Sequence, residues 1–171
     1  EWVFMKKKVL FNIFGLVFII LSFYSVYRLR NDFDGEYVYF LLVTIICVST
    51  DLGGFIFGKI FKGPKLTQIS PNKTYSGVIG AYTLSIIFSI LFIKSIYSNQ
   101  ILIFNKDLCV LIILISTVSQ IGDIIVSYFK RLANIKDTGK ILPGHGGLLD
   151  RIDGMIFAFP FAYIIISMNI F

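Results

Sequence analysis

Five apolar runs, each close to the length of a membrane span, constrain this chain more than any other feature. They occupy residues 9–27, 37–57, 77–93, 108–129 and 155–171. A helix needs about 20 apolar residues to cross the hydrocarbon core of a bilayer. Only 15% of the 171 residues are charged, whereas soluble domains carry about 25%. The sequence therefore predicts an all-α integral membrane protein, a single domain with about five transmembrane helices.

The basic residues are divided unevenly between the two sides of these spans. With the amino end in the cytoplasm, the inside segments hold most of them: Lys6, Lys7, Lys8, Lys59, Lys62, Lys65, Lys73, Lys130, Arg131, Lys136, Lys140 and Arg151. This asymmetry predicts that orientation, and we expect a multi-pass protein of the cell inner membrane. The net charge of +6 then serves topology and the binding of anionic headgroups or phosphorylated ligands, and we expect no nucleic-acid partner.

Four carboxylates are predicted to lie at the cytoplasmic side of the spans: Asp51, Asp123, Asp150 and Asp153. An ionisable group within a span is costly and usually faces a water-filled cavity or a charged partner. Mg²⁺ typically takes one or two carboxylates plus substrate phosphates. We therefore expect a polar cavity that faces the cytoplasm, with Asp123 and Asp150 as metal ligands. A structural ion pair with Lys or Arg is the alternative for Asp123.

A polar run at residues 130–154 contrasts with the apolar spans around it. Its glycines Gly144, Gly146 and Gly147 allow close backbone approach to an anion, although a flexible turn would also use glycine. His145 is expected to hydrogen-bond a ligand or the loop. Elsewhere, Lys73 stands in a turn before a span and is either a point-charge partner for phosphate or one more topology signal.

The same residues carry a family resemblance. The stretch "SYFKR" at 127–131, then "KD" at 136–137 and "PGHGGLLDRID" at 143–153 resembles the signature of the phosphatidate cytidylyltransferases. "TDLGGFIFGK" at 50–59 and "ISPNKTYSG" at 69–77 are similar to two further segments of that family. The resemblance covers roughly residues 40–160, the catalytic half, and implies additional amino-terminal spans.

The resemblance implies a reaction in which CTP and phosphatidate give CDP-diacylglycerol and pyrophosphate. It also implies Mg²⁺ and a second cation in a two-metal centre held by Asp123 and Asp150. The expected catalytic residues are Asp123, Asp150, Lys130, Arg131 and Arg151. The expected substrate-binding residues are Lys73, Ser70, Lys136, Gly144, His145, Gly146, Gly147, Asp51, Asp137 and Asp153.

Two other functions fit part of the pattern. A CTP-dependent lipid-alcohol kinase, or a related lipid nucleotidyltransferase, would use similar Asp, Lys and Gly residues with a different acceptor. An ion-coupled transporter would also explain carboxylates inside spans, but it predicts internally repeated broken spans, and no repeat relates the segments around Asp51 and Asp123. Membrane lipid is a partner if the chain is a cytidylyltransferase, and also if it is a lipid-alcohol kinase or related lipid nucleotidyltransferase. The sequence is compatible with a homodimer without predicting one.

Overall fold

The fold consists of helices throughout the part of the chain that the computed structural model describes. That part comprises residues 9–32, 37–67, 70, 73–97, 106–135, 137–139 and 147–168. The helices are α1 (Val9–Asn31), α2 (Val38–Phe61), α3 (Tyr75–Ile96), α4 (Lys106–Leu132) and α5 (Leu149–Ser167). The described backbone forms no strand, only one isolated bridge between Lys65 and Thr74. The predicted all-α class is confirmed.

Three of these helices are long and apolar enough to cross a membrane, counting only the described residues. They are α2, α3 and α4, with mean hydropathies of 2.1, 2.0 and 2.2. The spans predicted at 9–27 and 155–171 correspond to α1 and α5 and stay predictions as membrane crossings. The outward face of α1 is apolar, with Ile20 and Phe23 exposed, as expected of a surface that contacts lipid.

The fifth helix begins earlier than the apolar run that it was predicted from. It starts at Leu149 rather than at residue 155, so the polar residues before the apolar run form its first turn. Asp150 in that turn suits the positive end of the helix dipole. The helix thus carries its carboxylates on a regular scaffold rather than on a loop.

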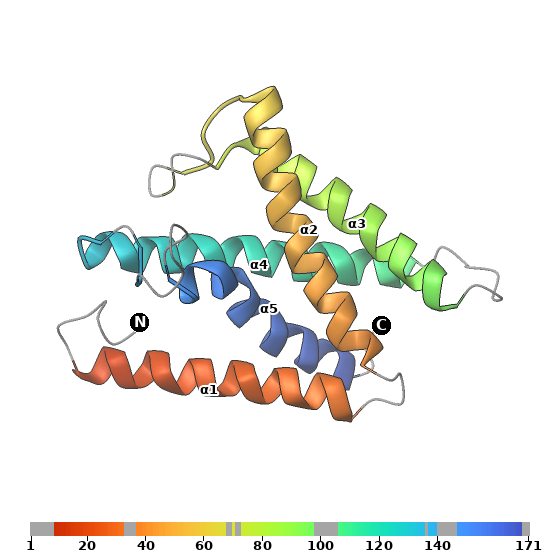
Figure 1. Ribbon diagram of the computed structural model, residues 1–171, viewed down its shortest axis with the longest axis horizontal. Coiled ribbons are helices and arrows are strands. Elements are labelled where there is room, and N and C mark those ends of the chain that lie inside the picture. The colour runs from red at the N-terminus through yellow and green to blue at the C-terminus, as the bar shows by residue number, and fades with distance from the viewer. Residues whose placement is uncertain are drawn as a thin grey trace.

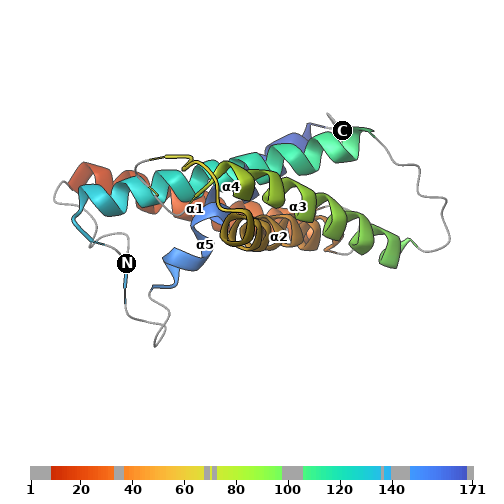
Figure 2. The same cartoon turned by 90° about the horizontal axis from the view of Figure 1, so that it is seen from above.

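The helices are arranged around α4 and α5, as Figure 1 shows. α2 and α3 pack side by side and cross α4, while α5 lies between α4 and α1. In the view turned by 90°, α2 is seen nearly end-on and α4 runs across the picture (Figure 2). The two helices therefore cross steeply, and Asp51 on α2 and Asp123 on α4 line one cavity.

The pairing of α2 with α3 depends on glycines where the two backbones touch. A Cβ on Gly53 would lie 2.9 Å from Ala81 Cα and closer still to the Gly80 carbonyl group. A Cβ on Gly77 would lie 2.8 Å from the Gly54 carbonyl oxygen. Small residues allow this kind of close approach between membrane helices, so the glycines hold α2 and α3 together as one unit.

The connection from α2 to α3 folds back on itself. The Leu66 N–H donates to the Lys73 carbonyl at 2.7 Å, and the Tyr75 N–H donates to the Pro64 carbonyl at 3.2 Å. Thr74 then caps α3, since its hydroxyl accepts a hydrogen bond from the Gly77 N–H at 3.1 Å. This folding fixes the backbone of Lys73 directly before the first turn of α3.

Candidate active site

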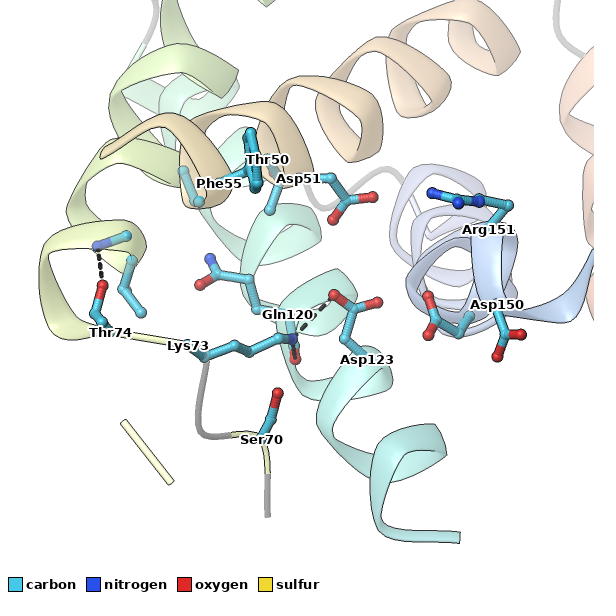
Figure 3. A pocket seen from close by; sticks show the side chains of 15 residues that line it. Thr50, Asp51, Phe55, Ser70, Lys73, Thr74, Gln120, Asp123, Asp150 and Arg151 are labelled. Carbon is cyan, nitrogen blue, oxygen red and sulfur yellow. Dashed lines mark hydrogen bonds and ion pairs between the residues drawn. The ribbon is translucent and has the colours of Figure 1, made fainter. Parts of the chain in front are cut away.

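A cavity of about 360 Å³ lies where α2, α4, α5 and the start of α3 meet. Figure 3 shows the carboxylate-bearing side chains of Asp51 and Asp123 turned toward the same space, with Arg151 across from them. The lining residues are Thr50, Asp51, Gly54, Phe55, Ser70, Lys73, Thr74, Gly77, Val78, Ala81, Gln120, Asp123, Asp150, Arg151 and Asp153. Residues separated by about 100 positions in the sequence therefore share one polar pocket.

An ion pair between Lys73 and Asp123 crosses the cavity. Lys73 Nζ lies 2.9 Å from Asp123 Oδ2 and 3.3 Å from the carbonyl oxygen of Gln120 (Figure 3). Asp123 Oδ1 is buried and accepts no hydrogen bond from any described residue. Because a buried carboxylate oxygen without a donor is costly, the second oxygen of Asp123 is available to a cation.

Asp153 shares this acidic environment with Asp123. Burial first, and then the neighbouring Asp123 carboxylate, raise the pKa of Asp153 to about 8, against a smaller lowering by Lys130. Two neighbouring carboxylates cannot both ionise cheaply without a positive charge nearby. The pair is therefore suited to share a cation or a proton.

Asp150 occupies a different environment, because the chain itself satisfies both of its oxygens. Oδ1 accepts a hydrogen bond from Lys130 Nζ at 3.0 Å, and Oδ2 accepts from the N–H groups of Thr138 and Gly147, both at 2.9 Å. Burial raises the pKa of Asp150, but these donors outweigh it and hold the pKa below its usual range. The carboxylate thus ties the residues after α4 to the start of α5.

Lys130 joins α4 to α5 at the same place. Its ammonium group lies 3.8 Å from Asp153 Oδ2, besides its contact with Asp150. Asp150 and Asp153, three positions apart on α5, therefore share Lys130 as a common partner. Lys130 itself does not line the cavity. It therefore neutralises Asp150 and Asp153 from outside the cavity lining.

One wall of the cavity is apolar and belongs to the α2–α3 pair. Phe55, Val78 and Ala81 form it, and the Phe55 side chain is exposed on the outside of α2. A buried hydrogen bond of 2.8 Å joins the hydroxyl of Thr50, another lining residue on α2, to that of Ser116 on α4. The cavity therefore combines a charged floor with an apolar side that reaches the outer surface of the helices.

The predicted site residues divide into three groups. Those that the structure brings to the cavity are Asp51, Ser70, Lys73, Asp123, Asp150, Arg151 and Asp153. Those that it describes but places outside the cavity lining are Lys130, Arg131, Asp137 and Gly147. Those that lie outside the described residues are Lys136, Gly144, His145 and Gly146.

Sequence reasoning missed several lining residues. Gln120 stands three positions before Asp123 on the same helix face, and a polar amide in an apolar span was a usable signal. Thr50 precedes Asp51 directly but faces α4 through its hydroxyl, which only the helix packing reveals. Val78 and Ala81 carry no chemical signal at all and line the cavity because glycines bring α3 close to α2.

The residues present fit a magnesium ion that also contacts a phosphorylated ligand. Within the described ranges, no three His, Cys, Asp or Glu side chains come together so as to hold a metal ion by themselves. Asp123 with its unpartnered oxygen and Asp153 beside it supply hard oxygen donors, which Mg²⁺ supplements with substrate phosphates and water. The second cation and the pairing of Asp150 with Asp123 stay predictions.

Comparison with known proteins gives a consistent result over nearly the whole chain. A model of the cytidylyltransferase family matches residues 3–169. Proteins named phosphatidate cytidylyltransferase from Brucella suis, Staphylococcus haemolyticus and Bacillus subtilis are 36%, 37% and 33% identical to this chain. These alignments cover 88%, 91% and 89% of this chain, but 54%, 58% and 56% of the relatives. The chain therefore spans little more than half the length of the relatives that it matches.

Proposed function

The chain belongs to the cytidylyltransferase family, and from that membership we propose that it is the catalytic part of a phosphatidate cytidylyltransferase. In this reaction CTP and phosphatidate give CDP-diacylglycerol and pyrophosphate. The observation that carries the proposal is the cavity in which Lys73 and Arg151 face Asp51, Asp123 and Asp153 beside an apolar wall. A charged floor suits a triphosphate, and an apolar side suits a lipid that stays in the bilayer.

The orientation of the site follows from the charge pattern of the loops. We place the cavity at the cytoplasmic face of the inner membrane, where CTP is available, because most of the basic residues fall in loops on that side. The apolar wall that includes Phe55 continues to the exposed side of α2. Phosphatidate can then present its phosphate to the cavity while its acyl chains remain in lipid.

The bond changes are those of an in-line displacement at phosphorus. A phosphatidate phosphate oxygen forms a bond to the α-phosphorus of CTP, and the bond from that phosphorus to the bridging oxygen breaks. Pyrophosphate leaves with the electron pair of that bond. No protein nucleophile enters the sequence of steps, so the protein acts by positioning the two substrates and neutralising charge.

The chain's own residues divide this work. We assign neutralisation of phosphate charge to Lys73 and Arg151, which line the cavity. Asp123 and Asp153 would hold Mg²⁺, which, when bound, withdraws negative charge from the triphosphate. We assign Asp150 a structural role, in which it ties the residues after α4 to the start of α5. Its carboxylate already accepts hydrogen bonds from Lys130, Thr138 and Gly147, which it would lose as a metal ligand.

The direct test is product formation in detergent micelles. We expect the purified protein to convert phosphatidate to CDP-diacylglycerol, detected by mass spectrometry, only with CTP and Mg²⁺ present. Asp123→Asn should lower turnover by a factor of at least about 10², the order lost with a main charge-stabilising group. Asp107→Asn is the matched control, since Asp107 lies in the first turn at the opposite end of the same helix.

The lipid kinase alternative predicts a different outcome of the same assay. Transfer of a phosphate from CTP to a lipid alcohol, with no product from phosphatidate, would replace the proposal by a lipid kinase. Full turnover in the Asp123→Asn protein would remove Asp123 from the site. Folding of each variant is checked by its elution and thermal unfolding in the same detergent.

A further inference from the structure

The contact between Lys73 and Asp123 joins two groups that the proposed reaction needs for different partners. Asp123 is needed by the cation, and Lys73 is needed by a substrate phosphate. In the structure they bind each other at 2.9 Å. Each group therefore already has a partner of opposite charge before a ligand binds.

The two groups are held in ways that differ in how easily they move. The Lys73 backbone is fixed, because its N–H donates to Ser70 at 3.1 Å and its carbonyl accepts from Leu66. Asp123 is fixed within α4. The Lys73 side chain, by contrast, is 26% exposed and ends in a flexible four-carbon stem. The lysine ammonium group can therefore leave the contact without moving the backbone.

The charge of the cavity favours such a departure once another cation is present. Among the described residues, the lining includes four carboxylates and two basic side chains, Lys73 and Arg151, and Lys130 adds one positive charge from outside the lining. A divalent ion bound to the free Oδ1 of Asp123 would share one carboxylate with the Lys73 ammonium group, which lies 2.9 Å from Oδ2. Two positive charges on one carboxylate repel each other, so the ion and Lys73 compete for Asp123.

We propose that Lys73 is an exchangeable counter-ion of Asp123. Without a divalent cation, Lys73 occupies the carboxylate and stabilises the cavity. When the cation and the nucleotide bind, the ammonium group leaves Asp123 and pairs with a phosphate of the triphosphate. This inference rests on the proposed function for the phosphate partner, but the competition between Lys73 and the cation does not require turnover.

The exchange makes a prediction that a fixed phosphate-binding lysine does not make. Lys73→Met should bind Mn²⁺ roughly tenfold more tightly than the wild type without nucleotide, because the competing charge is gone, and tenfold corresponds to about 1.4 kcal/mol. The same variant should bind CTP more weakly. A lysine that only contacts phosphate would change the CTP affinity alone, and a purely structural ion pair would weaken both.

The experiment is a Mn²⁺ titration followed by electron paramagnetic resonance, with the protein in detergent and no nucleotide. Lys65→Met is the matched control, because Lys65 is an exposed lysine of the same connection and does not line the cavity. Lys73→Arg keeps the charge and adds a bidentate donor that fits a carboxylate, so it should bind Mn²⁺ more weakly than the wild type.

The outcomes separate the exchange from the reaction. An order of Mn²⁺ affinity of Met above Lys above Arg at position 73, with Lys65→Met equal to the wild type, supports the exchange. Unchanged or weaker Mn²⁺ binding by Lys73→Met, or no binding by any of the proteins, overturns it. Should Lys73→Met not fold, Lys73→Arg decides: Mn²⁺ affinity equal to or above the wild type overturns the exchange. Failure of the wild type to form CDP-diacylglycerol would instead refute the proposed function.

Discussion

Gly154 lies where α5 meets α4 beside Asp123, and replacing it by alanine should separate the two helices. A Cβ at this position would lie 2.6 Å from Ser119 Oγ and 2.9 Å from both the Ser119 carbonyl oxygen and Asp123 Oδ1. Ordinary contacts of a Cβ begin at 3.4 Å, so the helices or the Asp123 side chain must shift by several tenths of an ångström. Overpacking of this kind costs about 1–3 kcal/mol.

The matched control for Gly154→Ala is Gly54→Ala, because its Cβ would meet only the Gly77 carbonyl oxygen at 3.9 Å. Both substitutions gain the same intrinsic helix preference of alanine over glycine, about 1 kcal/mol. That gain cancels between the variants, so their free energies of unfolding should differ by about 1–3 kcal/mol, with Gly154→Ala the less stable.

Turnover should respond to Gly154→Ala as well. A displacement of a reacting group by about 1 Å can lower a rate by about 10²-fold. Asp123 Oδ1 is one of the atoms that the new methyl group would contact. Unfolding is measured by denaturant titration in mixed micelles, and turnover by CDP-diacylglycerol formation. Equal stability of the two variants together with full turnover of Gly154→Ala would refute the packing argument.

Three further predictions concern separate contacts. A double-mutant cycle with Thr50→Val and Ser116→Ala should show a coupling of about 0.6–1.7 kcal/mol in unfolding free energy, as for other hydrogen bonds between membrane helices; additive effects would mean that the hydroxyls do not bond. Asp150→Ala should speed hydrogen exchange at the Thr138 amide, because the Asp150 carboxylate accepts a hydrogen bond from that amide. Because the folded pKa of Asp150 is lowered, that protection is complete above the ordinary carboxyl pKa of about 4 and is lost as the pH falls through the lowered value; protection already lost at pH 6 would contradict this assignment. Removing divalent cations with a chelator should abolish turnover, and added Mg²⁺ should restore it; turnover that persists in the chelator would exclude the metal.

The fold class and the placement of Asp123 were predictable from the sequence for one physical reason. Apolar runs of span length can only be helices in a bilayer, and a carboxylate inside such a run has to face a cavity or a partner. Asp123 does line the cavity, and Asp51 from another span joins it there. For these residues, position along a helix was enough to predict position in space.

The partner of Asp123 was not predictable in the same way. Lys73 reaches it from a connection whose fold depends on hydrogen bonds of the Leu66 and Tyr75 amides, and no sequence pattern specifies those bonds. The sequence left open whether Lys73 serves topology or phosphate, and whether Asp123 has a basic partner. The structure joins the two questions, since each residue is the other's partner.

Neighbouring positions on α4 show a second limit. Lys130 and Arg131 were expected to act together, but Lys130 faces α5 and contacts Asp150, whereas Arg131 is exposed and donates to the Ile135 carbonyl oxygen. Adjacent residues on a helix point about 100° apart, so only one of them can face a given neighbour. Which one does so depends on the rotation of α4, which the sequence does not specify.

The glycine contacts between α2 and α3 bear on the order in which the helices insert into the membrane. Two apolar helices with a short connection can enter the bilayer together as a hairpin, and Gly53 and Gly77 let this hairpin close before α4 has been synthesised. Lys73 is carried on the same hairpin, so its positive charge is already in place when Asp123 follows within α4. We expect α4 to insert with Asp123 close to the Lys73 ammonium group, which is already present. That positive charge lowers the free-energy cost of inserting the carboxylate, so α4 should insert more readily than its own sequence suggests.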